Sequence, residues 1–125
     1  MTENQIATVV VDAALQVHRA LGPGLLESVY ERVLAHELRR RGLAVRCQVP
    51  IPVVYDGIEL GVGFTADLLV AGRVIVELKS VARSLPVHKK QTLTYVRLAD
   101  LRLGLLLNFG APLMRDGITR VVNGL

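Results

Sequence analysis

Two carboxylates and a lysine flank one short apolar segment of the chain. Asp67 precedes the segment, Glu77 ends it, and Lys79 follows two positions later. Two carboxylates about 5 Å apart repel by roughly 3 kcal/mol at an effective dielectric near 20, so they raise a pKa or hold a cation. Oxygen ligands suit a hard ion such as Mg²⁺ or Mn²⁺. A lysine beside that ion could polarise a phosphate oxygen or help to deprotonate a water, but taken alone the pattern is more simply a salt-bridged pair on a solvated sheet face.

The spacing of these three residues depends on a turn. Leu, Val and Ile dominate the segment and residues 71–73 interrupt it, which predicts two strands around a loop. With a three-residue loop, Asp67 faces Glu77, and Lys79 shares the face of Glu77 because side chains alternate along a strand. A two-residue loop would shift the register by one residue and place Asp67 opposite Val76, on the other face.

The remaining elements follow from apolar periodicity and turn signals. A capping box at Thr2–Gln5 begins a helix, and Gly22-Pro23-Gly24 separates it from the next. We expect helices over residues 6–21, from Gly24 to about 41, and over 86–100, with strands within 44–70 and over 67–79, 101–109 and 118–122. The last helix acts as a crossover that returns residues 103–108 parallel to 74–79. The order predicts an α/β or α+β fold, with a mixed sheet flanked by helices.

Length and composition set limits on the protein class. The chain has 125 residues, enough for one domain with a substantial core, so we expect a single domain over residues 1–125. No apolar run reaches the roughly 20 residues that span a bilayer, and we find no signal peptide. Cys47 is the one cysteine, which suits a reducing cytoplasm, and we expect it to be buried.

The charge balance favours a polyanionic partner. Fifteen basic and eleven acidic residues give a net charge of +4. This suits nucleic acid, while an aromatic content of 4% without tryptophan argues against a platform for single strands. The arginine triplet at 39–41 is equally explained as a solvated helix end. The candidate phosphate contacts are Arg39, Arg40, Arg41, Arg83, Lys89 and Lys90.

Two motifs carry a resemblance to a known family. Asp67 with Glu77-Leu78-Lys79 resembles the D…(D/E)xK signature of the PD-(D/E)xK nuclease superfamily. Gly24-Leu-Leu-Glu27-Ser-Val-Tyr30 matches the motif of its small GxxExxY branch in full. The resemblance runs from about Val10 to the C-terminus. It implies a restriction-endonuclease-like core with an αβββαβ plan and an extra N-terminal helix.

The same resemblance implies roles for individual residues. Asp67, Glu77 and Glu27 would bind Mg²⁺ or Mn²⁺, Lys79 would activate the nucleophile, and Gln91 would support the site. Glu27 has an alternative role, since a carboxylate in the first turns of a helix is stabilised by the helix dipole. Supporting roles are expected for Tyr30, His88 and Tyr95. A core tyrosine is an equal interpretation of Tyr30, and a surface residue is the simpler interpretation of His88.

These features together predict a metal-dependent nuclease that acts on DNA. A homodimer would present two sites to two strands. The alternative is a catalytically silent module that binds nucleic acid or assembles with other proteins while keeping the nuclease fold. Hydrolysis of a nucleotide or another small phosphoester is a third hypothesis.

Overall fold

One mixed sheet forms the centre of the protein, and the computed structural model describes all of residues 1–125. The sheet has five strands in the order β1-β2-β3-β4-β5, so neighbours in the chain are neighbours in the sheet. Only β3 and β4 run parallel, through the crossover that α3 makes. The elements are α1 (Glu3–Leu21), α2 (Glu27–Arg40), β1 (Val45–Tyr55), β2 (Ile58–Val70), β3 (Val74–Lys79), α3 (Pro86–Leu98), β4 (Leu103–Asn108), the 3₁₀ helix η1 (Met114–Gly117) and β5 (Ile118–Val122).

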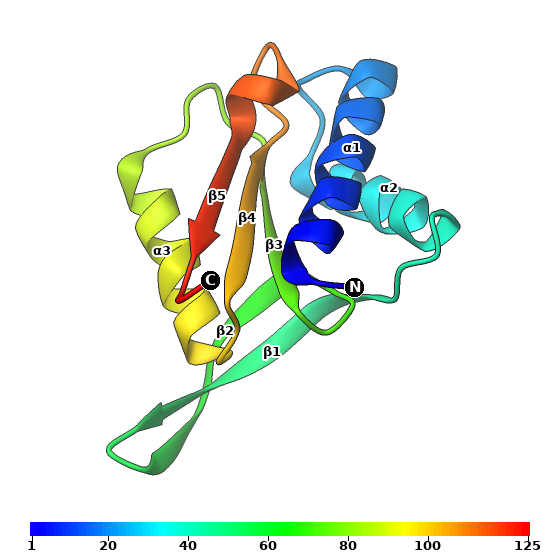
Figure 1. Cartoon of the computed structure of the whole chain (residues 1–125). Helices are drawn as coiled ribbons and strands as arrows, with labels where there is room; N and C mark the ends of the chain where they lie inside the picture. Colours follow the sequence, from blue (N-terminus) through cyan, green and yellow to red (C-terminus); the bar gives the residue numbers. More distant parts are fainter.

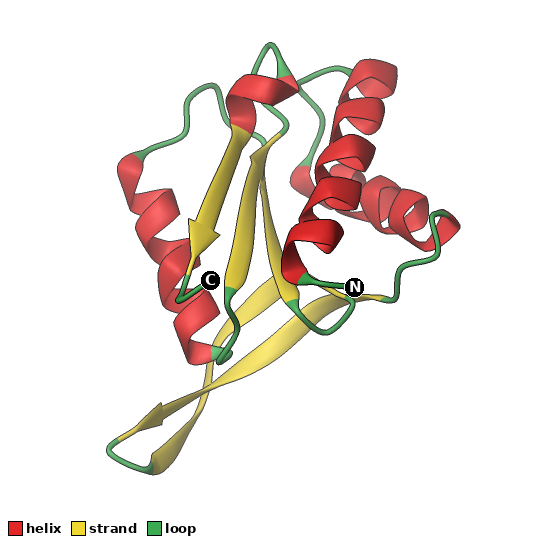
Figure 2. Ribbon diagram, viewed as in Figure 1, coloured by secondary structure: helices red, strands yellow, loops and turns green.

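Helices cover both faces of this sheet. Helices α1 and α2 lie on one face and α3 on the other (Figures 1 and 2). The larger core lies between the sheet and α1 and α2, and includes Leu34, Val76 and Leu105. A smaller core joins α3 to the opposite face through Val96 and Ile75. This mixed α+β arrangement is a restriction-endonuclease-like fold, as the family resemblance implies.

Most of the expected elements are confirmed, with small shifts at their ends. Thr2 caps α1 in the expected capping box, because its side chain accepts from Gln5 N and the Gln5 side chain accepts from Thr2 N. Helix α2 begins at Glu27, later than the sequence predicts, so Glu27 lies in its first turn. The 3₁₀ helix η1 before β5 is not predicted from the sequence.

The β1–β2 hairpin extends well beyond the helices as an arm (Figure 1). Its turn is Asp56-Gly57, where both residues have positive φ, which is the geometry that matches the twist of a hairpin. We define the arm as residues 52–63. Cys47, at the base of this hairpin, is exposed, so the expectation of a buried cysteine is wrong.

Both strands of the hairpin change face near its base. Side chains of a regular strand alternate, so residues four positions apart share a face. Val45 packs in the larger core, yet Val49 packs in the smaller core across the sheet. On the neighbouring strand, Leu68 packs in the larger core and Ala66 in the smaller. In both strands, therefore, the alternation of side chains between the two sheet faces is interrupted, between Val45 and Val49 and between Ala66 and Leu68.

The reversal coincides with an unusual backbone conformation at Gln48. Its φ is 52°, in the left-handed region, and it lies opposite Asp67 between two regular strand pairs. The other non-glycine residues with positive φ, Asp56, Ala71 and Asp100, lie in turns or directly after a helix. A side chain held in this region costs on the order of 1 kcal/mol. Gln48 thus kinks the hairpin where Asp67 stands.

Candidate active site

Asp67 and Glu77 meet where β2 and β3 separate. The loop has the predicted length, because Val70 pairs with Val74, and the ladder continues to Leu68 opposite Val76. Beyond that pair, side chains replace backbone acceptors. Glu77 Oε1 accepts from Asp67 N at 3.2 Å, and Asp67 Oδ2 accepts from Leu78 N at 2.9 Å. Each carboxylate therefore accepts a hydrogen bond from a backbone N–H of the opposite strand, at the place where the two backbones are no longer paired.

The environment of Glu77 favours its protonated form. Its side chain is largely buried, and burial together with the neighbouring Asp67 raises the pKa of Glu77 to about 9. Lys79 offsets a part of this shift through its positive charge. Without a further cation, Glu77 therefore carries little negative charge at neutral pH.

A pocket of about 240 Å³ gathers the acidic side chains. Four carboxylates line it, from Glu27 and Glu31 on α2, Asp67 on β2 and Glu77 on β3, together with Lys79. The remaining lining residues are Ser28, Gln48 and Leu78. The structure thus brings the predicted acids and lysine around one cavity that contains a single hydrophobic residue.

Two further residues of the pocket, Glu31 and Gln48, are not predicted from the sequence. Gln48 Nε2 donates to Glu31 Oε1, and to Asp67 Oδ1 at 3.4 Å. Burial raises the pKa of Glu31, the hydrogen bond from Gln48 lowers it, and repulsion by Asp67 raises it. A signal for Glu31 is present in the sequence, because it lies four positions after Glu27 and so shares its helix face. Nothing in the strand pattern singles out Gln48.

The donor set suits a hard divalent cation. It consists of carboxylate oxygens beside a buried acid pair, with neither a histidine nor a cysteine among the lining residues. No three acidic, histidine or cysteine side chains converge closely enough to hold an ion in this conformation. The chemistry of the pocket therefore fits such an ion, and binding it would require the carboxylates to move closer together.

Helix α3 brings Tyr95 toward the acids. The Tyr95 ring stacks on Phe64 with centroids 4.0 Å apart. Burial raises the pKa of Tyr95, and the charges of Glu77 and Asp67 raise it further. Gln91 is exposed one turn earlier on α3 and does not line the pocket. Its role at the site stays a prediction.

His88 and Tyr30 make contacts that shape the loops around the site. His88 Nδ1 accepts from Leu85 N, so the imidazole caps the first turn of α3. Tyr30 is fully buried and stacks on Phe109. Its hydroxyl donates to Gly22 O and accepts from Leu25 N, rather than contacting Glu27. Tyr30 thereby fixes the loop that leads into α2, as a core tyrosine would.

The predicted phosphate contacts lie at different places. Arg40 and Arg41 pair with Glu37 at the C-terminal end of α2, and Arg41 also pairs with Asp12. Arg39 donates to Val45 O. This arginine triplet is engaged within the protein, and the length of α2 places it about 20 Å along the helix from Glu27. Its role in binding nucleic acid stays a prediction.

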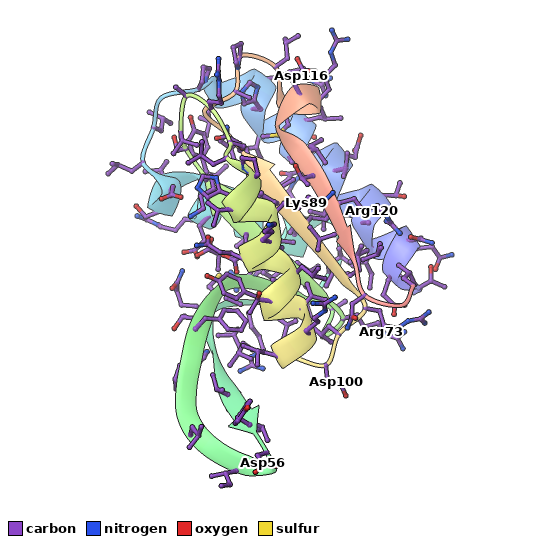
Figure 3. All side chains as sticks on the ribbon, turned by 90° about the vertical axis from the view of Figure 1, so that its left-hand side faces the viewer. Asp56, Arg73, Lys89, Asp100, Asp116 and Arg120 are labelled. Atoms are coloured by element: carbon purple, nitrogen blue, oxygen red, sulfur yellow. The ribbon has the colours of Figure 1, made fainter.

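The other predicted phosphate contacts are free of ion pairs. Arg83 is exposed in the loop between β3 and α3. Lys89 and Lys90 lie near the N-terminal end of α3 and line a hollow with Arg120 of β5. Figure 3 labels Lys89 and Arg120 on these two elements. None of the three predicted contacts forms a salt bridge, so their charges remain available to a polyanion.

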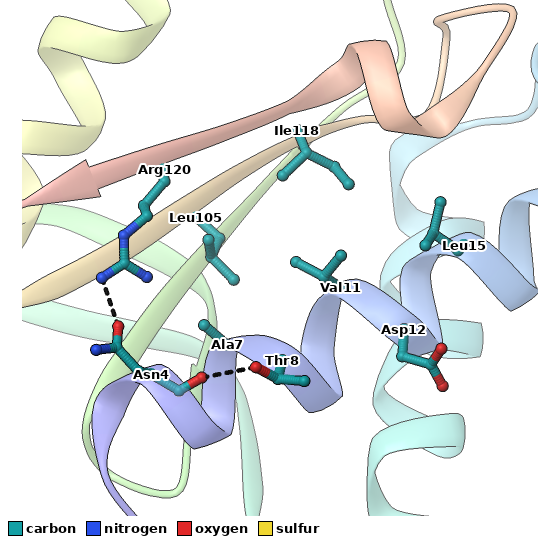
Figure 4. A pocket seen from close by; sticks show the side chains of 9 residues that line it. All are labelled: Asn4, Ala7, Thr8, Val11, Asp12, Leu15, Leu105, Ile118 and Arg120. Atoms are coloured by element: carbon teal, nitrogen blue, oxygen red, sulfur yellow. Dashed lines mark hydrogen bonds between the residues drawn. The ribbon is translucent and has the colours of Figure 1, made fainter.

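A larger groove lies elsewhere, between α1 and strands β4 and β5 (Figure 4). Its volume is about 490 Å³ and its lining is mainly apolar. At one end Arg120 donates to Asn4, and the only carboxylate is Asp12, which pairs with Arg41. The groove lacks paired acids and a free lysine. Size therefore does not mark the reactive site, and the smaller acidic pocket is the candidate.

Comparison with known proteins agrees with this geometry. A family model described as the PD-(D/E)XK nuclease superfamily matches residues 4–121. The chain belongs to the PD-(D/E)XK nuclease superfamily. Comparisons with curated proteins and with solved structures found no match.

Membership of the PD-(D/E)XK superfamily accounts for the combination of acids and lysine at one pocket. Nucleases of this superfamily typically use divalent metal ions and bind nucleic acid. The signature residues Asp67, Glu77 and Lys79 all line the pocket. A separate finding is that no helix has both the length and the apolar character needed to cross a membrane.

Proposed function

We propose that this protein is a metal-dependent nuclease that hydrolyses phosphodiester bonds in DNA. The observation that carries the proposal is the half-buried Asp67 beside the buried Glu77, with Lys79 in the same pocket. We also infer that it belongs to the GxxExxY branch, on the basis of Gly24, Glu27 and Tyr30 in the motif spacing. Residues 1–125 would form one domain, and the single cysteine suits a cytoplasmic protein.

The residues of the pocket would have separate roles in hydrolysis. Asp67, Glu77 and Glu27 would hold Mg²⁺ or Mn²⁺, with the Glu31 carboxylate beside them. A bound ion supplies positive charge at the phosphate and lowers the pKa of water. Lys79 would orient the attacking water and offset the charge that develops on the phosphate oxygens. Gln91 would support this arrangement from α3.

The distribution of free positive charge indicates how the substrate approaches. The pocket carries acids, so the phosphate backbone needs basic residues beside it rather than within it. Arg83 follows β3 by four residues, and Lys89 and Lys90 lie near the N-terminal end of the next helix. Their contacts would be independent of base sequence, because they address phosphates. We propose that they form the first contacts to DNA.

A second candidate function is binding without cleavage. It is favoured by one observation, namely that no three ligands converge on one point in this conformation. Such a module would hold nucleic acid through its basic residues and use the acids for a structural ion, or for none.

Cleavage assays with matched variants separate these functions. We expect the wild-type protein to cut DNA in Mg²⁺ or Mn²⁺, and Asp67→Asn or Lys79→Ala to reduce the rate by about a hundredfold or more. Asp56→Asn is the control, since Asp56 lies at the tip of the arm (Figure 3) and does not line the pocket. A panel of DNA, RNA and small phosphoesters identifies the substrate. Binding without turnover in either metal would refute the nuclease and support the module.

We further propose that two copies of the chain pair through the arm. The arm exposes Val54, Tyr55, Ile58, Leu60 and Val62 on a hairpin that no helix covers. A group of exposed apolar side chains on one hairpin favours an interaction site in a soluble protein. Pairing would place two active sites on one assembly.

A further inference from the structure

Gln48 combines a strained backbone with a side chain that joins two acids. Its backbone is left-handed in the middle of β1, where any other strand residue of this chain except glycine has negative φ. Its amide nitrogen donates to Glu31 of α2 and to Asp67 of β2. A primary amide has two hydrogens, so it can serve both acceptors at once.

These two properties explain each other. The extended conformation sends successive side chains to opposite faces, and the reversal of alternation at Gln48 changes where this side chain emerges. Strained backbone conformations persist where the surrounding structure or function requires them. Here the kink delivers a hydrogen-bond donor to the space between a helix carboxylate and a strand carboxylate.

We propose that Gln48 is a positioning residue of the acidic pocket, which holds the carboxylates of Glu31 and Asp67 in a fixed relation. The proposal rests on the proposed metal-dependent function. An amide suits this task better than the alternatives. A leucine would leave two carboxylates to repel each other, while a lysine or arginine would neutralise them and compete with a cation. An amide orients both groups and leaves their negative charge intact.

Metal affinity tests this role with a control of matched geometry. Gln48→Gly removes the amide and relaxes the backbone, and Ala71→Gly relaxes the same φ of 52° in the β2–β3 turn without touching the pocket. We expect Gln48→Gly to weaken Mn²⁺ binding about tenfold or more in calorimetry, and Ala71→Gly to leave it unchanged. Gln48→Asn, which keeps an amide and tolerates this backbone, should restore part of the affinity. Equal Mn²⁺ affinity in Gln48→Gly and the wild type would overturn the proposal.

A second measurement needs no metal. In ¹⁵N-labelled protein with chelator, the side-chain amide signals of Gln48 should shift in Glu31→Ala and again in Asp67→Ala, because each variant removes one acceptor. Unchanged signals in both variants would show that the amide holds neither carboxylate and would overturn the proposal. If the wild type binds no Mn²⁺ yet both variants shift the signals, the metal-dependent function fails while the positioning role stands.

Discussion

Glu77 is the residue whose chemistry depends most on its surroundings. Its buried position and the neighbouring Asp67 carboxylate both disfavour its charge, so its pKa rises to about 9. A protonated Glu77 can share its proton with Asp67, which also accepts from the Leu78 amide and from the Gln48 side chain. A cation bound here must displace that proton, because metal ligands bind in their deprotonated form. Metal binding at this pocket would therefore be coupled to proton release.

The raised pKa predicts how stability depends on pH. The folded protein retains the Glu77 proton up to about pH 9, whereas an unfolded glutamic acid loses it near 4.5. Between these values the folded state binds more protons, so the free energy of unfolding falls as pH rises. The slope from this one group is at most about 1.4 kcal/mol per pH unit. Denaturant titrations between pH 5 and 8.5, in chelator, measure it.

Glu77→Gln isolates this contribution, because glutamine resembles the protonated acid and cannot ionise. The variant should lose the downward slope and become more stable than the wild type at alkaline pH. Glu59→Gln, in the exposed arm, is the control and should keep the wild-type slope. Parallel pH profiles for Glu77→Gln and the wild type would contradict the assignment of a buried, protonated Glu77.

The role of a residue could be predicted from the sequence where it depends on local geometry. The three-residue loop sets Asp67 and Glu77 together, since turn length and strand periodicity fix the register. Gln48 could not be predicted, because its role depends on a left-handed backbone that only glycine or asparagine would have signalled. Glu31 could have been found through its helical spacing from Glu27, yet its contact with Gln48 joins elements distant in the chain.

At the scale of elements, β3 and β4 form the base on which Lys79 is held. The two strands run parallel, and Lys79 pairs with Asn108 at their carboxyl ends. The Asn108 side chain accepts from Val81 N and Gly110 N and donates to Val81 O. Gly110 approaches so closely that a Cβ there would collide with Val81 O. This contact locks the segment after Lys79 against the end of β4.

Asn108→Ala should weaken the attachment of the segment after Lys79 to the end of β4. Asn108 is buried, and its loss leaves three backbone groups without partners, so we expect the free energy of unfolding to fall by about 2–3 kcal/mol. Hydrogen exchange at the Val81 amide should accelerate. Asn123→Ala is the matched control, because that side chain makes one hydrogen bond, to Leu101 O, and should cost about 1 kcal/mol. Equal losses in the two variants would contradict a special role for Asn108.

The elements themselves were more predictable than the way they bend. Apolar periodicity, the capping box at Thr2 and the turn at Asp56-Gly57 each act over a few residues, and each is confirmed. The order of strands and the parallel β3–β4 pair follow from the crossover helix. The change of face in the β1–β2 hairpin depends on packing against helices on both sides, which local patterns do not encode.

At the scale of the whole molecule, charge and apolar surface are segregated. No lysine or arginine lies between Arg46 and Arg73, although the chain carries a net charge of +4. This span includes the entire arm, whose only charges are Asp56 and Glu59. An acidic, apolar surface repels phosphate, so the arm does not suit nucleic acid. The arm of a second copy of the chain is a better partner for this surface, because a two-fold axis brings identical apolar patches together.

This segregation predicts a dimer that dissociates when the arm is made polar. We expect the triple variant Tyr55→Ser, Ile58→Ser and Leu60→Ser to sediment with half the mass of the wild type, since it removes the apolar contacts. The fold should survive, because these three side chains are exposed and belong to neither core. Leu26→Ser and Leu113→Ser remove exposed apolar residues outside the arm and should leave the mass unchanged. A monomeric wild type over a wide range of concentration, or a triple variant that remains dimeric, would exclude the arm as the contact between two copies.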